Sequence, residues 1–188
     1  MLPERMVCKA SAEAFRKAHG KTSRKGDLQM IQHPIAPIYN AQSRILILGS
    51  FPSVKSREMQ FFYGHPQNRF WKVCAGVFDC EVPKSIEEKR EFLLSNGIAL
   101  WDVIASCEIE GSADSTIRNV IPNDLTQLLA CAAIERIYVN GKTALRCYDQ
   151  WIRPMIGQEA ICLPSTSPAN AAWSLERLMD AWQQIRQK

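Results

Sequence analysis

Four short apolar runs, each followed by an amphipathic or polar stretch, recur along this chain and constrain its fold more than any other feature. The first run, Arg44-Ile-Leu-Ile-Leu-Gly49, is continuous and closed by glycine, as in a strand buried on both faces. Further runs cover residues 98–104 and 136–140, and the fourth ends near Leu163. Strands that alternate with helices pair in parallel, with helices on both faces of the sheet. We therefore predict an α/β three-layer sandwich with a mainly parallel four-stranded central sheet.

The stretches between these runs have helical periodicity. We expect helices over about residues 68–78, over 85–95, over about 123–132, from Gly141 onward, and after Ser167-Pro168. Ser85 and Glu88 have the spacing of a capping box, and Ser167-Pro168 has the pattern of an N-cap followed by a first-turn proline.

Neither a membrane span nor a disulfide-stabilised fold is favoured. A chain of 188 residues can bury a core without metals or disulfides, and its longest aliphatic run, residues 45–48, is too short to cross a bilayer. The seven cysteines are scattered, with no CxxC pair, and the N-terminus has no signal-peptide pattern. We therefore expect a reduced, cytoplasmic protein.

No metal or organic cofactor is predicted. Asn140-Gly-Lys-Thr143 ends like a phosphate-binding loop, but Arg136 occupies the position of the first glycine that such a loop requires. The histidines lack metal-ligand spacing, and Cys107 has no general base nearby in the sequence. An iron–sulfur cluster is disfavoured because three of the cysteines lie in apolar helical patterns.

The first 29 residues differ in charge from the rest of the chain. They contain seven Lys or Arg and three acidic residues, whereas residues 30–188 contain sixteen of each sign. We predict a basic, poorly ordered extension over residues 1–29 and one domain over 30–188. The extension either adds sequence-independent phosphate affinity or is dispensable, with Met30 as the natural start. Within the domain, basic residues gather over 41–78, which predicts one basic edge.

The unusual residues lie where the predicted strands end, which is where ligands bind to parallel sheets. They form the segments Gly49-Ser-Phe-Pro-Ser53, Trp101-Asp102, Asn140-Gly141 and Pro164-Ser-Thr-Ser-Pro168. The loop over residues 50–67 is long and rich in aromatic residues, and such loops in compact domains are usually functional. Its rings either stack on a flat base or fill the core, and for Phe61 and Phe70 both interpretations stay open.

Several segments resemble one known family. Leu48-Gly-Ser-Phe-Pro-Ser53 and Phe62-Tyr-Gly-His-Pro-Gln-Asn-Arg-Phe-Trp71 are similar to motif 1 of the hypoxanthine-DNA glycosylase family, within the uracil-DNA glycosylase superfamily. The resemblance continues in order through residues 99–104, 111–114, 139–142 and 163–170, and covers nearly everything from Ile31 onward. It implies a uracil-DNA glycosylase-like fold and hydrolysis of the N-glycosidic bond of deaminated bases, with hypoxanthine favoured.

The resemblance also implies roles for individual residues. The mismatch-specific uracil-DNA glycosylases have a water-orienting Asn where this chain has Phe51, so the catalytic amide is expected at Asn68; alternatively, Asn68 only caps the next helix. Asp102 is expected to act as general base, to steady a cationic sugar, or to cap a loop. The remaining expected contacts are Phe51, Pro52, Tyr63, Ser112 and Asn140 for the base, and Ser53, Lys55, Ser165, Thr166 and Ser167 for the DNA.

The implied partner is double-stranded DNA with a flipped damaged base, bound by a monomer without an obligate protein partner, in the cytoplasm at the nucleoid. Three alternatives stay open. The first is an enzyme of the same superfamily that acts on uracil or on thymine opposite guanine. The second is a non-catalytic nucleic-acid-binding module, and the third is an α/β protein that binds a small metabolite.

Overall fold

A sheet of four parallel strands forms the middle layer of the molecule. The structure is a computed structural model that describes residues 29–186, and its central sheet has the strand order β3-β2-β6-β7. The strands are β2 (Ile45–Gly49), β3 (Ile98–Asp102), β6 (Arg136–Asn140) and β7 (Ala160–Leu163). Every adjacent pair is parallel. All five residues of β2 are buried, as expected for a strand covered on both faces.

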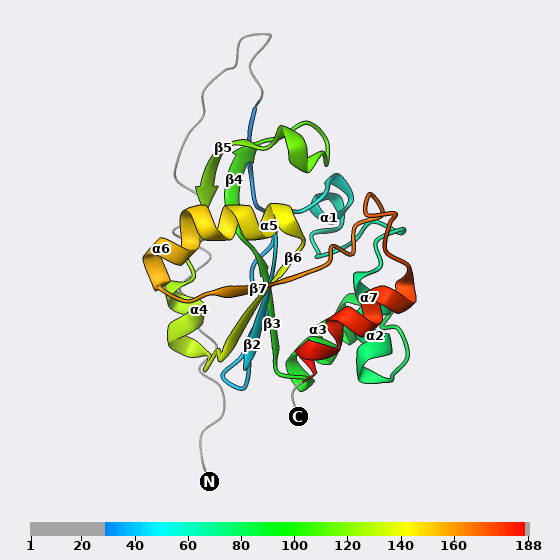
Figure 1. Ribbon diagram of the computed structural model, residues 1–188. Helices are drawn as coiled ribbons and strands as arrows, with labels where there is room; N and C mark the ends of the chain where they lie inside the picture. The colour runs from blue at the N-terminus through cyan, green and yellow to red at the C-terminus, as the bar shows by residue number, and fades with distance from the viewer. Residues whose placement is uncertain (1–28, 187–188) are drawn as a thin grey trace.

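Helices cover both faces of this sheet (Figure 1). On one side lie α2 (Phe70–Phe78), α3 (Ile86–Ser95) and α7 (Leu175–Trp182); on the other lie α4 (Thr126–Cys131), α5 (Lys142–Cys147) and α6 (Arg153–Ile156). The short elements are α1 (Val54–Met59), the π-helical turn η3 (Tyr148–Ile152), and the 3-10 turns η2 (Asp114–Thr116) and η4 (Gln183–Ile185). The predicted three-layer α/β sandwich with a parallel four-stranded sheet is confirmed.

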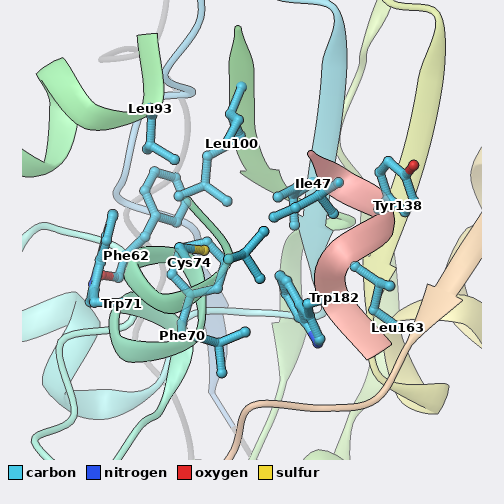
Figure 2. Packing of buried hydrophobic residues seen from close by; sticks show 14 of the residues in the cluster. Ile47, Phe62, Phe70, Trp71, Cys74, Leu93, Leu100, Tyr138, Leu163 and Trp182 are labelled. Atoms are coloured by element: carbon cyan, nitrogen blue, oxygen red, sulfur yellow. The ribbon is translucent and has the colours of Figure 1, made fainter. Parts of the chain in front are cut away.

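Two apolar clusters fill the space between the layers. Successive residues of β2 alternate between them: Ile45 and Ile47 pack with residues of α2, α3 and α7, whereas Leu46 and Leu48 pack with residues of α4 and α5. Figure 2 shows Trp182 of α7 between Phe70 of α2 and the sheet. The ring centroids of Trp182 and Phe70 are 5.7 Å apart. Both Phe61 and Phe70 belong to the cluster on the side of α2, α3 and α7.

A second, antiparallel sheet lies beyond the carboxyl ends of the central strands. Its order is β1-β4-β5, from β1 (Met30–Gln32), β4 (Ile104–Glu108) and β5 (Arg118–Pro122). The single strand predicted over residues 98–104 is therefore wrong at its end, because the chain leaves the central sheet at Val103. The Val103 N–H donates to the Gly49 carbonyl at 2.8 Å. Apolar residues continue across the break, so the sequence pattern does not mark it.

The helix ends follow the predicted capping patterns except in the last helix. The capping box of Ser85 and Glu88 is present at the start of α3. The last helix does not begin after Ser167-Pro168. It begins at Leu175, where the side chain of Ser174 accepts a hydrogen bond from the backbone N–H of the third helical residue.

The predicted extension over residues 1–29 lies outside the described residues apart from Gln29. Within residues 29–186, no helix is long and apolar enough to cross a bilayer. In the same range, no group of three His, Cys, Asp or Glu side chains is placed to hold a metal ion.

Candidate active site

A chain of hydrogen bonds joins four polar residues at the carboxyl edge of the central sheet. Asn140 Nδ2 donates to Tyr63 Oη at 3.0 Å and to Thr166 Oγ1 at 2.9 Å. Thr166 Oγ1 in turn donates to Asn68 Oδ1 at 3.0 Å. We call Tyr63, Asn68, Asn140 and Thr166 the amide network. Asn140 ends β6 and Thr166 follows β7, so the parallel strands bring these distant parts of the sequence together.

Two donors fix the orientation of the Asn68 side chain. Its Oδ1 accepts hydrogen bonds from the Phe70 N–H at 2.9 Å and from Thr166 Oγ1 at 3.0 Å. An amide oxygen has two acceptor sites, so both are filled. Nδ2 of Asn68 has no partner among residues 29–186 and is the group that this side chain leaves available. Asn68 is not the N-cap of α2, which is Arg69, but its side chain accepts a hydrogen bond from the first residue of that helix and also belongs to the amide network.

Asn140 and Thr166 hold each other by two hydrogen bonds. The Thr166 N–H donates to Asn140 Oδ1 at 3.0 Å, and Asn140 Nδ2 donates to Thr166 Oγ1. These contacts fix which end of the Asn140 amide is the oxygen. Thr166 is fully buried. The hydroxyl expected from the sequence to contact DNA is thus used inside the network.

Tyr63 is held in an uncommon backbone conformation, with φ of 52°. Its ring is stacked on Phe70, with centroids 3.9 Å apart and an interplanar angle of 14°. One face of the ring is therefore covered by protein. Burial, and secondly the charge of Asp102, raise the pKa of the Tyr63 phenol well above its ordinary value. The hydroxyl consequently stays protonated at neutral pH.

Asp102 ends β3 and is buried, with 4% of its surface exposed. Its Oδ2 lies 2.8 Å from His33 Nε2, and its backbone carbonyl accepts a hydrogen bond from Asn123 Nδ2 at 2.8 Å. A Cβ added at Gly49 would collide with Asp102 Oδ1 and lie 3.2 Å from Tyr63 Oη. Glycine at this position therefore lets the carboxylate and the phenol approach the end of β2 from the same side.

The residues after β2 form a loop that Arg57 holds together. Phe51 and Pro52 are buried. The Arg57 guanidinium lies 5.6 Å from the centroid of the Phe51 ring, and it donates to the Pro52 carbonyl at 2.8 Å and to the Gly111 carbonyl at 3.3 Å. Ser53 caps α1. The backbone at Pro52 is expected from the sequence to contact the base. In this structure its carbonyl accepts the hydrogen bond from Arg57.

The loop around residues 109–116 packs against the same region. Ser50 Oγ lies 3.3 and 3.2 Å from the two carboxylate oxygens of Asp114, and Ser112 Oγ accepts a hydrogen bond from the Val54 N–H at 2.9 Å. Burial raises the pKa of the Asp114 carboxyl, against the opposing effect of the Ser50 hydrogen bond. Lys55 is exposed and forms an ion pair with Glu58 at 2.7 Å.

Arg69 organises the loop between β7 and α7. Its guanidinium donates to four backbone carbonyls, those of Thr166, Ser167, Asn170 and Trp173. Inside this loop, Ser165 Oγ accepts from the Ser167 N–H at 3.2 Å, and Ser167 Oγ accepts from the Ala169 N–H at 3.3 Å. Both serines are half-buried. These tertiary bonds are the reason that residues 167–173 form a loop and not the first turns of the last helix.

The structure thus brings Asn68, Tyr63, Asn140 and Thr166 into one network, with Asp102 connected to it across Gly49. Ser53, Ser112 and Lys55 lie apart, at or near α1. Sequence reasoning missed the contacts of two residues, His33 and Arg69. Neither carries a local signal, because one is an isolated histidine and the other a single arginine beside α2.

Comparison with known proteins gives a consistent result. A family model described as "Uracil DNA glycosylase superfamily" matches residues 36–186. A protein from Methanosarcina acetivorans named hypoxanthine DNA glycosylase is 35% identical over 150 residues, which is 79% of this chain and 94% of the relative. A protein of the same name from Methanosarcina barkeri is 32% identical over 148 residues, covering 78% of this chain and 92% of the relative.

A solved structure also has this fold. The chain is similar to a solution NMR structure from Methanosarcina acetivorans, of a protein provisionally assigned as a uracil DNA glycosylase, with a TM-score of 0.70 and 29% sequence identity. The match covers 85% of this chain and 100% of that structure.

Proposed function

The chain belongs to the uracil DNA glycosylase superfamily, and from that premise we propose that it is a hydrolytic DNA glycosylase that removes deaminated bases in base-excision repair. Hypoxanthine is the favoured substrate because both relatives that cover most of the chain are named for that base. The observation that carries the proposal is the amide network at the carboxyl ends of the strands, with a buried carboxylate beside it.

The reaction requires the protein to position the water and the nucleotide and to stabilise the charge that develops on the sugar and the base. Cleavage of an N-glycosidic bond passes through a sugar with oxocarbenium character, so water, a nearby negative charge and donors to the departing base lower the barrier. The substrate base must first leave the DNA stack, at a cost of a few kcal/mol that is smaller for a mispaired base. The amide network and the buried Asp102 carboxylate can offer such groups to an extruded nucleotide.

We assign Asn68 to position the attacking water. Because both acceptor sites of Oδ1 are filled, water reaches this oxygen only when the Thr166 hydroxyl turns away; otherwise it binds Nδ2. Asp102 supplies the negative charge, either to steady the cationic sugar or to accept the proton of the water.

The base is assigned to the side of the network that Tyr63 and Asn140 form. Phe70 covers one face of the Tyr63 ring, so a flipped base stacks on the other face. Asn140 Nδ2 uses its two protons on Tyr63 and Thr166 in this structure, so it donates to a base oxygen only when that oxygen takes the place of the Tyr63 hydroxyl. We also assign the backbone at Phe51 and Pro52 and the loop bearing Ser112 to the base, which requires Arg57 to release the Pro52 carbonyl and the Ser112 loop to contact the base from outside the amide network.

We assign the DNA backbone to the surface formed by Ser53, Lys55, Ser165 and Ser167, with the loop held by Arg69 as the part that enters the groove. Arg57 and Arg69 bind backbone carbonyls of the protein, so they order loops and are not counted as phosphate contacts. We expect the enzyme to act as a monomer on double-stranded DNA at the nucleoid, without a cofactor.

The test is cleavage of labelled duplexes that contain hypoxanthine, uracil or a G·T mismatch, with alkali used to break the resulting abasic sites. We expect hypoxanthine release by the wild type and a loss of about 100-fold or more in Asn68→Ala. Asn96→Ala is the matched control, because Asn96 Nδ2 only bonds the Phe92 carbonyl at the end of α3.

The alternatives give different results in the same assay. Cleavage of uracil or thymine without hypoxanthine would make a pyrimidine the substrate. Salt-sensitive DNA binding without cleavage of any duplex would identify a non-catalytic binding module. Equal activity in Asn68→Ala and the wild type would contradict the assignment of Asn68.

A further inference from the structure

His33 is a buried histidine that lies outside the parallel sheet. Its side chain contacts Asp102, the last residue of β3. His33 follows β1, and its backbone N–H donates to the Ala105 carbonyl of β4 at 2.7 Å. Its side chain is 2% exposed. The rings of Phe51, Phe62 and Trp101 surround the imidazole, with centroids 5.9, 6.1 and 6.4 Å away. The position lies just before the part of the chain that matches the superfamily model.

The hydrogen bonds of the imidazole define its tautomer. The Ile35 N–H donates to His33 Nδ1 at 3.2 Å, so this nitrogen carries no proton. The proton is therefore on Nε2, which lies 2.8 Å from Asp102 Oδ2 and donates to it. A neutral imidazole and an ionised carboxylate satisfy both contacts.

The second oxygen of the Asp102 carboxylate, Oδ1, is available to a substrate or a water molecule. Oδ1 of Asp102 has no hydrogen-bond partner among residues 29–186, and it is not among the fully enclosed polar atoms of that range that lack a partner. It lies over the bare Cα of Gly49, near Tyr63 Oη. One oxygen is thus anchored by histidine, and the other is directed toward the amide network with some access to solvent.

From this geometry we propose that His33 is a positioning residue for the glycosylase reaction: it donates a proton from Nε2 to Asp102 Oδ2 and thereby holds Oδ1 toward the extruded nucleotide. The inference rests on the proposed function. The groups that face the carboxylate are His33 from the segment after β1, Tyr63 from the loop before α2, and Asp114 from the loop after β4. Of these, only His33 donates a hydrogen bond to it.

The anchor matters because the bond from His33 is the one hydrogen bond to the Asp102 carboxylate among residues 29–186. Tyr63 makes no hydrogen bond to this carboxylate in the described part of the chain, and Asp114 is itself acidic, so His33 is the donor that holds Asp102 there. A misplacement of a reacting group by about 1 Å can lower a rate by about 100-fold. Removing the donor also leaves a buried carboxylate oxygen without its hydrogen bond, which costs free energy.

The experiment compares His33→Phe with His33→Gln in single-turnover cleavage of hypoxanthine-containing duplex. Phe keeps the ring contacts but has no donor, whereas the Gln amide can donate from a position near that of Nε2. We expect His33→Phe to lower the cleavage rate by about 10- to 100-fold with duplex affinity changed less than about 3-fold. His33→Gln should restore the rate to within about 3-fold of the wild type, a rescue that a packing role would not produce.

Two further measurements separate positioning from folding. Tyr138→Phe removes a partly buried hydrogen bond of 2.7 Å to the Gln184 carbonyl, outside the amide network, and should lower the melting temperature without lowering the cleavage rate. In an Asp102→Asn background, His33→Phe should change the rate less than about 2-fold, because its effect acts through the carboxylate.

The outcomes are distinct. Wild-type cleavage with an unchanged rate in His33→Phe overturns the inference and leaves the proposed function intact. The same holds if His33→Phe and Asp102→Asn lower the rate independently, or if Gln fails to rescue a folded variant. A wild type that cleaves no deaminated base overturns the proposed function, and this inference with it.

Discussion

Replacement of Arg69 by methionine should both destabilise the protein and disorder the loop between β7 and α7. The guanidinium donates to four carbonyls of that loop, with the Ser167 and Asn170 oxygens at 2.8 and 3.0 Å and the Thr166 oxygen at 3.4 Å. A hydrogen bond to a charged group contributes about 1.5–3 kcal/mol. The four are not additive, because they share one side chain and the loop is partly open to water.

We therefore expect Arg69→Met to lower the free energy of unfolding by about 3 kcal/mol, the value of one or two of these bonds. For a protein of this size, that corresponds to a fall of about 6–12 °C in melting temperature. The cleavage rate should fall by about 10-fold or more, because Thr166 lies in this loop and holds Asn68. Urea unfolding and single-turnover cleavage of a hypoxanthine duplex measure the two effects.

The matched control is Arg177→Met, which removes the same charge from a residue bound to the same loop. The Arg177 side chain is exposed, its guanidinium donates to one carbonyl, that of Ala172, at 3.2 Å, and it lies 4.7 Å from the centroid of the Trp173 ring. We expect Arg177→Met to lower the free energy of unfolding by less than about 1 kcal/mol and to leave the cleavage rate unchanged. Equal losses in the two variants, or full stability in Arg69→Met, would refute the assignment of Arg69 as organiser of the loop.

Three further predictions follow from single contacts. Gly49→Ala should lose about 1–3 kcal/mol in urea unfolding and most of its cleavage rate, because the new methyl group meets Asp102 Oδ1; wild-type activity would contradict this. The pKa of Asp114 is raised by burial above its ordinary value of 3.8, so the stability it contributes is complete below that pH and is lost as pH rises through the folded pKa. From about pH 4 upward, the free energy of unfolding of the wild type should therefore fall relative to that of Asp114→Asn. Profiles of this free energy against pH that run parallel in the two proteins would contradict the prediction. Ser174→Ala removes the N-cap of α7 and should cost about 1 kcal/mol in thermal unfolding with little change in cleavage rate, whereas Ser167→Ala should leave α7 intact.

The central layer could be predicted from the sequence because its signals are local. A continuous apolar run such as that of β2 is explained by burial on both faces, and the Ser85 capping box needs only its own turn. The small antiparallel sheet could not be predicted, because apolar Val103 and Ile104 follow Asp102 and make the sequence read as one strand over residues 98–104.

The start of the last helix shows a different limit. Ser167-Pro168 and Ser174 both have side chains that can cap a helix, and local propensity does not choose between them. The choice is made by Arg69, which is far away in the sequence and binds the carbonyls that a helix over residues 167–173 would need for itself. His33 was missed for the same reason: its function depends on a carboxylate 69 positions away.

The contact of Asn68 with α2 is compatible with the catalytic role proposed for its amide. The N-cap of α2 is Arg69, but the Phe70 N–H at the start of the helix is one of the two donors that fix the Asn68 side chain, and Thr166 is the other. A side chain that orients water must itself have a fixed orientation, and the first N–H of α2 supplies part of it. His33 stands in the same relation to Asp102. In both cases hydrogen bonds within the protein fix a side chain and leave one of its polar atoms without a partner among residues 29–186, Nδ2 in Asn68 and Oδ1 in Asp102, and these are the two atoms that the proposed reaction needs.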